Sequence, residues 1–307
     1  MIPEPNPETF NADAVVIGGS YAGLSAALQL ARARRRVVVV DAGAPRNRMA
    51  AASHGLLGRD GASPAAIAAE GRSQLLAYPT VTWVDGAVTA ATARDGGFGI
   101  TIGDDRHLTT RRVVIATGVT DTLPDIPGLA ERWGRSVFHC PYCHGYELNE
   151  GRIGVLATGP TSLHHATMLP DWGRVTLFTN AALELDIDQR AALTRRGVGI
   201  EPTPVAALAD EATVVLRDGR RLVMDGLFTM SHTRPASDAA EQLGCAFDSG
   251  PMGPFVRTDP LKATTVPGVF ACGDVARGAG SVALAVGDGT QAGIATHQSL
   301  LLPPPGL

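Results

Sequence analysis

The chain has 307 residues and a formal net charge of −4, with 26 Lys and Arg against 30 Asp and Glu. This balance gives no general attraction to nucleic acid or acidic membranes, so neither is expected as a partner. No apolar run approaches the roughly 18 residues that span a bilayer, and no signal peptide is visible. A cytoplasmic location and about two domains are therefore expected.

The first half of the chain predicts a strand–helix–strand unit followed by a meander. This order implies a parallel sheet with a right-handed crossover. The expected elements are strands at 13–18 and 36–41, helices over 21–34 and 62–77, short alternating strands over 81–115, and a returning strand at 112–118.

Near residue 123 the pattern changes, and a second strand–turn–helix begins at residue 153. By residue 245 the chain turns towards strand and loop again, and a last helix is expected over about 282–299. The plan predicts an α/β fold in which a second domain, 123–244, is inserted into a first domain formed by 1–122 and 245–307.

A glycine-rich turn follows the first strand and fits G-x-S-x-x-G. Gly18 allows the tight turn, Gly23 lets the helix pack closely, and Ser20 is small enough for backbone to approach a pyrophosphate. The helix N-terminus offers free N–H groups to the phosphates. Asp41, at the end of the next strand, is placed to accept ribose hydroxyls. The turn predicts a Rossmann-like dinucleotide-binding domain, without separating FAD from NAD.

Two later segments favour FAD. Ala116-Thr117-Gly118 and the stretch that ends in Gly273-Asp274 resemble paired signatures of FAD-binding disulfide reductases. By that resemblance Asp274 holds the ribityl chain and the following helix points its N-terminus at the flavin. The full set of residues expected to bind FAD is Gly18, Ser20, Tyr21, Ala22, Gly23, Asp41, Ala42, Arg48, His54, Val88, Ala116, Thr117, Gly118, Gly273, Asp274, Val282 and Ala283.

The chemical centre is the pair Cys140 and Cys143. Two cysteines in C-x-x-C can close a disulfide across the first turn of a helix, and Pro141 suits the first helical position. A helix N-terminus also lowers a thiol pKa. Three other readings compete: C-x-x-C-H attaches c-type haem, zinc would need about four ligands, and the pair could simply be buried. Disulfide exchange is preferred, and no metal is expected.

At this point the chain resembles the low-molecular-weight thioredoxin reductases over nearly its whole length. The resemblance implies two Rossmann-like domains of the three-layer ββα type, FAD, and a homodimer. It also implies that Cys143 is the sulfur beside the flavin and Cys140 the exchange partner. Those reductases carry aspartate after the second cysteine, whereas this chain has His144, which can take a thiol proton near neutrality. His54 is similar to a flavin-edge position, with a solvent-exposed histidine as the alternative.

The second domain departs from a reductase. Its turn has Ala157 for the first glycine, a stiff Pro160, and Ser162 where glycine or alanine normally packs. The strand after it runs into Thr179-Asn180 with Glu184 and Asp186 following, where the reductases hold the 2′-phosphate with arginines. NADPH is therefore not expected as a cofactor, although Asn180 leaves a contact with the ribose of NADH open.

The sequence Cys-Pro-Tyr-Cys-His-Gly-Tyr-Glu resembles the motif of thioredoxin reductase-like dithiol oxidases, which close disulfides in small natural products such as gliotoxin or holomycin. That resemblance implies a small dithiol, or a protein disulfide, as substrate and O₂ as electron acceptor. The alternatives are an NAD(P)H-dependent thioredoxin or disulfide reductase, a flavin–disulfide redox sensor, and a ferredoxin-fed reductase.

Two further features stand outside this scheme. Cys245 and Cys272 have no close partner in sequence, and Cys272 is expected to be a small buried hydrophobe. His164 and His165, early in the second domain's helix, are expected on the helix surface.

Overall fold

The computed structural model describes residues 11–301, and this part of the chain forms two compact units. Within the described range, the first unit comprises residues up to 48, residues 64–120 and residues from 233 onward. The second unit comprises residues 49–63 and 121–232. The insertion of one unit into the other explains why the first unit is discontinuous.

The first unit is built on a seven-stranded sheet in the order β3-β2-β1-β6-β5-β4, with β19 also paired to β6. The strands β1, β2, β3, β6 and β19 run parallel, and β4 and β5 are antiparallel. The elements are β1 (Ala12–Ile17), α1 (Tyr21–Arg32), β2 (Val37–Asp41), α2 (Pro64–Leu76), β3 (Val81–Asp85), β4 (Val88–Arg94), β5 (Gly97–Ile102), β6 (Arg106–Ile115), α6 (Ala239–Gln242), β17 (Phe247–Gly250), β18 (Gly253–Val256), β19 (Val269–Ala271), η5 (Asp274–Ala276) and α7 (Val282–Leu301).

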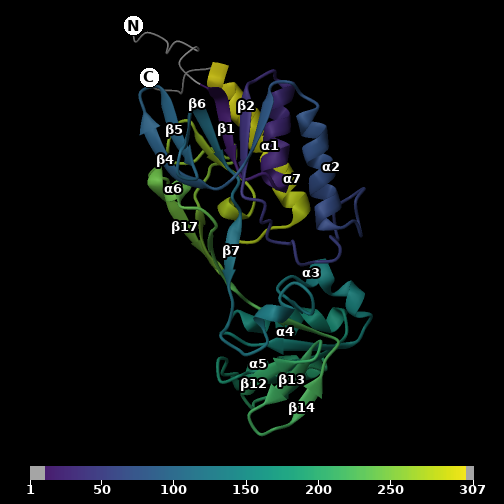
Figure 1. Cartoon of the computed structure of the whole chain (residues 1–307). Helices are drawn as coiled ribbons and strands as arrows, with labels where there is room; N and C mark the ends of the chain where they lie inside the picture. The colour runs from purple at the N-terminus through teal and green to yellow at the C-terminus, as the bar shows by residue number, and fades with distance from the viewer. Residues whose placement is uncertain (1–10, 302–307) are drawn as a thin grey trace. The chain divides into compact units, whose positions relative to one another are not determined.

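Alternate side chains of β1 enter two different cores, which makes this unit three layers deep. Ala14 and Val16 pack with α1 and α7, whereas Val15 and Ile17 pack with the meander strands β4 and β5. A strand that is buried on both faces has a continuous apolar sequence, as residues 14–17 do. Helices α1, α2 and α7 lie on one side of the parallel strands β1, β2 and β3, and the meander strands β4 and β5 lie on the other side (Figure 1). The three-layer prediction is confirmed.

The predicted meander over 81–115 is wrong in one respect. Its first strand, β3, pairs in parallel with β2 and extends the central sheet. The returning strand is also longer than expected, because β6 begins at Arg106. Residues 106–110 of β6 pair with β5, and residues 110–115 pair with β1. One strand therefore joins the meander to the parallel sheet.

The second unit repeats the same plan. Its five-stranded parallel sheet has the order β11-β10-β9-β15-β8, beside a three-stranded antiparallel sheet β12-β13-β14. The elements are η2 (Ala130–Arg132), β8 (Val137–Phe138), α3 (Pro141–His144), η3 (Tyr146–Leu148), β9 (Arg152–Leu156), α4 (Ser162–Met168), η4 (Leu169–Asp171), β10 (Arg174–Phe178), α5 (Ile187–Arg195), β11 (Gly199–Glu201), β12 (Val205–Ala209), β13 (Thr213–Leu216), β14 (Arg221–Val223) and β15 (Gly226–Thr229).

Two cores again lie on either side of the parallel sheet. Ile153 and Val155 of β9 pack with residues of α4 and α5, while Leu156 and Leu227 pack with β12 and β13. The repeated architecture is the one expected from two successive strand–helix–strand patterns.

The chain passes between the units along a two-stranded ribbon. Strand β7 (Val119–Thr122) pairs with β16 (His232–Pro235), so the two crossings are joined to each other. The chain returns to the first unit at residue 233, earlier than the expected residue 245. The reason is α6, whose Ala239 and Ala240 are buried in the core of the first unit and whose Gln242 accepts a hydrogen bond from the Ala91 amide at 2.8 Å.

A segment expected in the first domain packs instead with the second unit. Residues 49–63 leave the first unit after β2 and rejoin it at α2. The segment is closed on itself, because Ser53 and Ala62 form an isolated bridge and the Gly61 amide donates to the Ser53 carbonyl at 2.9 Å. It carries His54, one of the expected FAD ligands.

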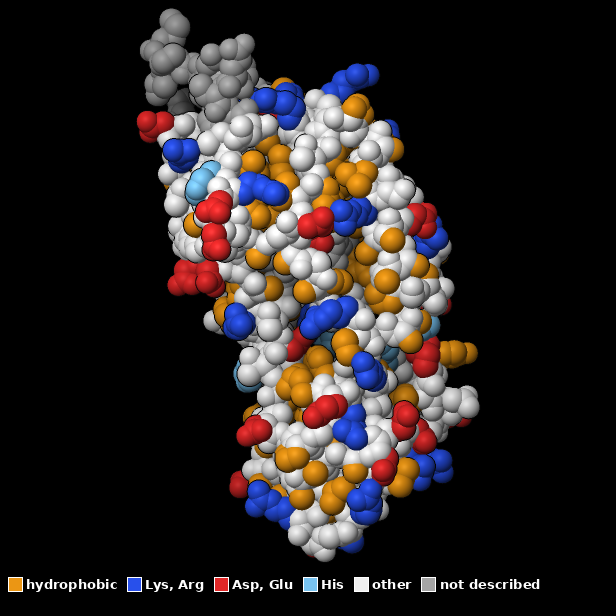
Figure 2. Space-filling view, viewed as in Figure 1, with side chains coloured by type: hydrophobic (Ala, Val, Ile, Leu, Met, Phe, Trp, Pro, Cys, Tyr) orange, Lys and Arg blue, Asp and Glu red, His pale blue; other side chains and the backbone are white. Residues whose placement is uncertain are grey.

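The visible face of the protein carries charges of both signs, interspersed without a large single-sign field (Figure 2). Among residues 11–301, no helix has the length and apolar composition needed to cross a membrane.

A buried ion cluster joins α7 to the loops on either side of β19. Asp288, with a side chain 5% exposed, lies 2.7 Å from the Lys262 ammonium and 2.5 Å from Arg277 Nε. Burial alone would raise the pKa of Asp288, but the hydrogen bonds from Arg277 and Lys262 outweigh it and hold the pKa below its ordinary value. Asp288 thus compensates two cations at once.

We expect Asp288→Asn to lower the free energy of unfolding by about 3 kcal/mol, because the amide keeps the shape but leaves two cations uncompensated. Urea unfolding followed by circular dichroism measures the effect. Asp104→Asn, in an exposed turn, is the matched control and should stay within about 0.5 kcal/mol of the parent. Equal stability of the two variants would contradict a structural role for the cluster.

Candidate active site

The turn between β1 and α1 has the geometry of a phosphate cradle. Gly18 has φ +106°, and a Cβ there would overlap the Ala116 carbonyl; a Cβ on Gly23 would overlap the Gly18 carbonyl. Ser20 is the N-cap residue of α1, yet its side chain makes no capping hydrogen bond, and the first turn contains no acidic residue. The amides at this helix start therefore remain available to an anion.

The side chains around this turn fit a dinucleotide. Asp41, at the end of β2, accepts a hydrogen bond from the Gly19 amide at 2.9 Å through one carboxylate oxygen, Oδ1. Tyr21 and Ala22 begin α1 and are buried. The hydroxyl of Thr117 is buried and has no hydrogen-bond partner among the described residues. A buried hydroxyl without a partner costs free energy, so a ligand that bonds it would be stabilising.

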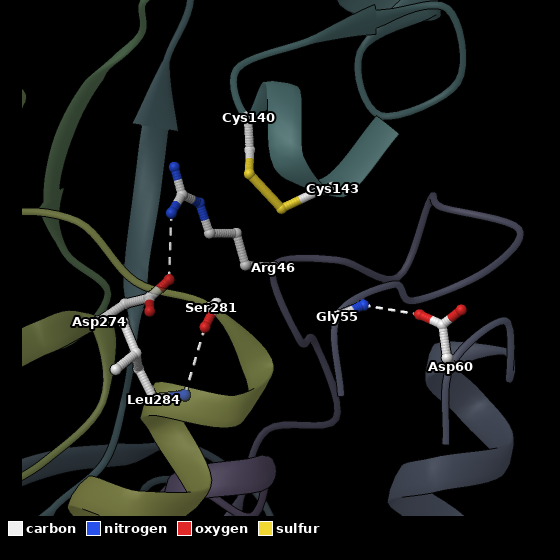
Figure 3. The surroundings of a disulfide bond; sticks show 8 residues. All are labelled: Arg46, Gly55, Asp60, Cys140, Cys143, Asp274, Ser281 and Leu284. Atoms are coloured by element: carbon white, nitrogen blue, oxygen red, sulfur yellow. Dashed lines mark hydrogen bonds and ion pairs between the residues drawn. A yellow bond between two sulfur atoms is a disulfide. The ribbon is translucent and has the colours of Figure 1, made fainter. Parts of the chain in front are cut away.

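The second expected signature lies beside the first. Strand β19 pairs with β6, which brings Gly273 and Asp274 close to the chain end that carries Ala116 and Gly118. The Asp274 carboxylate accepts a hydrogen bond from Arg46 at 3.0 Å (Figure 3). Sequence reasoning missed Arg46, because nothing local links it to a residue 228 positions away.

The helix that follows begins as predicted. Val282 and Ala283 form the first turn of α7, and the Ser281 hydroxyl accepts a hydrogen bond from the Leu284 amide at 3.3 Å. Together these residues could hold FAD in the first unit.

Four more residues were expected to bind FAD, and they belong to other segments than this turn. Ala42 and Arg48 are exposed after β2, and the Arg48 guanidinium donates to the Pro45 carbonyl at 3.1 Å. Val88 pairs with Ile102 and packs against the core on the meander side. His54 lies in the segment 49–63, which packs with the second unit.

Cys140 and Cys143 are joined by a disulfide in the second unit, with Cα atoms 5.3 Å apart. As predicted, the bond closes the first turn of a helix: Cys140 is the N-cap residue of α3 and Pro141 is the first helical residue. Strand β8 ends at Phe138, so the parallel sheet delivers the pair at its carboxyl edge. Both cysteines are half-buried, which leaves the disulfide partly open to solvent.

His144 stands at the end of the same helical turn and stacks on Phe138, with ring centroids 4.3 Å apart and an interplanar angle of 21°. Burial lowers the pKa of His144 below its ordinary value, the Glu147 carboxylate opposes that shift, and His54 adds to it. A neutral imidazole next to the disulfide can accept a thiol proton. Sequence reasoning missed Phe138, because stacking depends on the side-chain rotamers around α3.

The other two cysteines are buried thiols, as expected for Cys272. Burial raises the pKa of Cys272 to about 12, and burial also raises the pKa of Cys245, whose thiol contacts the Thr264 hydroxyl. Neither thiol is suited to exchange, because exchange requires the thiolate. Within residues 11–301, no cluster of three or more His, Cys, Asp or Glu could hold a metal ion.

The expected surface position is correct for His164 and wrong for His165, which is 4% exposed. Because α4 packs its inner face on the sheet, the His165 ring meets Phe228 edge-on with centroids 6.1 Å apart. Burial and the charge of His164 lower the pKa of His165 to about 4, against a hydrogen bond to the His139 backbone that raises it. His165 therefore remains neutral at pH 7.

We expect this burial to make stability depend on pH. Between pH 6.5 and pH 4 the unfolded chain binds a proton at residue 165 that the folded chain excludes, so acidification across this window favours unfolding by about 3 kcal/mol. His165→Gln should remove most of that slope, measured as the change in urea midpoint between pH 7 and pH 4.5. His164→Gln is the control, and an unchanged slope in both variants would show that residue 165 does not titrate as stated.

Comparison with known proteins agrees with this arrangement. Residues 12–289 match the family described as pyridine nucleotide-disulphide oxidoreductase. A solved structure described as the oxidoreductase from Agrobacterium tumefaciens is 57% identical with a TM-score of 0.93, and the match covers 95% of this chain and 99% of that one.

Two fungal relatives are named thioredoxin reductase. That of Claviceps purpurea, tcpT, is 36% identical over 279 residues, covering 85% of this chain and 86% of the relative. That of Leptosphaeria maculans, sirT, is 34% identical over 302 residues, covering 92% of each. Membership of this family implies FAD, for which the first unit has a fitting cradle. The chain belongs to the pyridine nucleotide-disulphide oxidoreductase family and is a thioredoxin reductase-like flavoprotein oxidoreductase.

Proposed function

We propose that this flavoprotein oxidises a small dithiol to a disulfide through Cys140 and Cys143, with FAD and then O₂ as electron acceptors and without NADPH. One observation carries the proposal against a pyridine nucleotide-dependent reductase. The first amides of the helix in the dinucleotide turn of the second unit donate to carbonyls of the turn itself, whereas the corresponding helix start of the first unit has no side-chain cap and no acidic residue in its first turn.

The turn of the second unit follows β9. The Thr158 amide donates to the Ser162 hydroxyl at 3.0 Å, and Ser162 is 1% exposed. The first three amides of α4, where a dinucleotide-binding fold offers donors to the pyrophosphate, donate to carbonyls of the turn itself at 3.1 to 3.2 Å. Pro160 contributes no amide at all. Both the internal hydrogen bonds of the turn and the proline at position 160 therefore reduce the number of backbone N–H groups that could bind the pyrophosphate of NADPH.

The strand end where a ribose phosphate would sit is also committed. The Asn180 side chain accepts a hydrogen bond from the Val205 amide at 2.8 Å, so it is already used to hold the adjacent backbone. Asp186 forms a capping box with Gln189 at the start of α5. These contacts hold the backbone after β10 in place. The carboxylates in the same loop would repel a 2′-phosphate.

The arginine beside this strand end is engaged as well. Arg220 donates to both carboxylate oxygens of Glu201, at 2.7 and 3.1 Å, and to Asp218 at 2.8 Å. The hydrogen bond from Arg220 is the main reason that the pKa of Glu201 falls to about 2. Because Glu201 pairs with Phe178 at the end of β10, this ion pair lies beside that strand end, and Arg220 is committed to carboxylates rather than available to a 2′-phosphate.

The thiol chemistry balances without a pyridine nucleotide. A substrate thiolate attacks Cys140 and forms a mixed disulfide, and Cys143 leaves as a thiolate. The second substrate thiol then displaces Cys140, which gives the cyclic or linear disulfide product and a reduced enzyme dithiol. FAD supplies two-electron acceptance from that dithiol and delivery of the electrons to O₂, which becomes H₂O₂. His144 accepts the proton of the attacking thiol, since its imidazole is kept neutral by burial.

We expect a dithiol to bleach the flavin of the purified holoenzyme in the absence of air, and NADPH to leave it oxidised. Dithiothreitol and NADPH are titrated anaerobically in parallel while absorbance near 450 nm is followed. On admission of air, the dithiol-reduced sample should return to yellow and yield one H₂O₂ for each dithiol added. Rapid bleaching by NADPH would reject the oxidase and favour the reductase.

The control for this titration is Cys143→Ser. It removes the disulfide but leaves the FAD cradle of the first unit untouched. The variant should bind FAD and resist bleaching by the dithiol. If it bleached at the parent rate, the electrons would not pass through the cysteine pair.

We expect His144→Gln to slow flavin reduction by a dithiol about 100-fold at pH 7.5, the low end of the range for losing a general base. The base acts when neutral, so the parent rate falls only as the pH drops below the lowered pKa of His144, which lies under 6.5. Stopped-flow rates from pH 5 to 8 should show this acid limb in the parent and not in the variant.

The stacked ring provides a second test of the same base. Phe138→Leu removes the aromatic surface that helps bury His144, so the pKa of His144 should move up towards 6.5. The acid limb of the rate profile should then move to higher pH with FAD content unchanged. An acid limb that stayed in place would separate the titrating group from His144.

A further inference from the structure

The disulfide site has a neighbour that comes from far away in sequence. Segment 49–63 packs with the second unit and carries His54. The segment is held in shape at its tip, where the Gly55 amide donates to Asp60 Oδ1 at 2.8 Å (Figure 3). Asp60 is thus fixed in orientation next to the histidine that precedes Gly55.

His54 lies between two carboxylates. Its Nε2 is 3.4 Å from Glu147 Oε1, and its Nδ1 is 3.6 Å from Asp60 Oδ1. These separations are longer than a formed hydrogen bond, as contacts of catalytic groups often are in ligand-free structures before they tighten. The two ring nitrogens therefore face different acids, one on η3 and one in the tip of the segment.

The inner carboxylate also acts on the base of the disulfide site. Glu147 follows His144 by three residues, and its charge raises the pKa of His144, while the charge of His54 lowers it. The titratable groups that face His54 from the packed elements are Asp60, Glu147 and His144. The side chain of His54 is 21% exposed, that of Glu147 41% and that of Asp60 69%. His54 is thus the least exposed of the three, and Asp60, at the outer end, is the most open to water.

Oxidation of a dithiol creates a need for such a series. Each turnover removes two thiol protons from the substrate, and His144 must release the first proton before it can accept another. His144 is partly buried and stacked on Phe138, so direct access to water is limited on that side of its ring. Proton transfer to a neighbouring carboxylate offers an alternative route.

On the basis of the proposed thiol oxidation, we infer that His54 is a proton-relay residue of the disulfide site, carrying protons from Glu147 to Asp60 and solvent. Glu147, after receiving a proton from His144, donates it to His54 Nε2. The Nδ1 proton of His54 passes to Asp60 Oδ1 and then to water. One proton moves outward at each step, His54 returns to its starting form by exchange of tautomers, and no electrons travel this way. His54 therefore positions and moves protons without touching the substrate.

The test is His54→Gln in the FAD-loaded enzyme. Anaerobic stopped-flow reduction by dithiothreitol should be about tenfold slower than in the parent at low buffer concentration, because the base recharges slowly. Raising the concentration of imidazole buffer at constant pH and ionic strength should restore most of the rate in the variant and leave the parent unchanged. This buffer dependence is a signature that a loss of structure would not produce.

Asp60→Asn interrupts the outer end of the relay with little change in shape. Its amide oxygen can still accept the hydrogen bond from the Gly55 amide, but it cannot take up a proton. The same slowing and the same buffer rescue are expected. His107→Gln, an exposed histidine of the first unit that contacts Thr101, is the matched control and should behave as the parent.

The inference is overturned if His54→Gln reduces at the parent rate in dilute buffer, or if its loss of rate is not restored by imidazole. Failure of the proposed function has a different result, because the parent flavin itself would then resist the dithiol. A variant that loses FAD is replaced in the comparison by Asp60→Asn, whose parent-like rate in dilute buffer would also overturn the relay.

Discussion

The stacking of Phe138 against His144 is the interaction on which the disulfide site depends. The ring centroid of Phe138 also lies 5.7 Å from that of Phe228. Phe228 in turn packs edge-on with the ring of the buried His165. This aromatic series supports both ends of the C-x-x-C turn, since His165 bonds the backbone of His139 and Phe138 covers His144. Burial of the His144 ring is the main cause of its lowered pKa, so the ring is favoured in its neutral form and can accept a proton.

The two units share a fold and differ at the start of the helix that follows their first strand. In the first unit, Gly23 lies in the first turn of α1, and the N-cap residue Ser20 makes no side-chain capping bond. In the second unit, Ser162 takes the position that corresponds to Gly23 and bonds the Thr158 amide, and the first three amides of α4 donate to carbonyls of the turn. The first arrangement leaves helix-start amides available to phosphate, and the second engages them internally. A single architecture thus supports one cofactor site and, in the proposed function, one former site that now only positions the disulfide.

Local patterns were enough to predict much of this protein. Continuous apolar runs identified β1 and β2 as strands buried on both faces, and the two strand–turn–helix patterns indicated the repeated three-layer plan. The C-x-x-C spacing with Pro141 predicted the disulfide turn, which α3 confirms. Each of these signals depends on residues within about ten positions of one another, where the spacing itself determines geometry.

Long-range packing could not be predicted in the same way. No local signal shows that segment 49–63 leaves its own unit, or that His54 lies beside Glu147. The burial of His165 was also missed, because a histidine pair at the start of a helix reads as polar surface until the face of α4 is known. The early return at residue 233 depends on how α6 fits the first core. In each case the decisive contact joins residues that are distant in the chain.

In the proposed function, protons leave the disulfide site rather than enter it, and the residue at position 144 suits that direction. A reductase must deliver protons to its product thiols, which favours an acid at the position of His144, as the aspartate of related reductases provides. Here that position holds a base whose neutral form is favoured by burial, next to carboxylates of increasing exposure. In the proposed function, electrons and protons leave the substrate by separate routes, the electrons through Cys143 and the protons through His144.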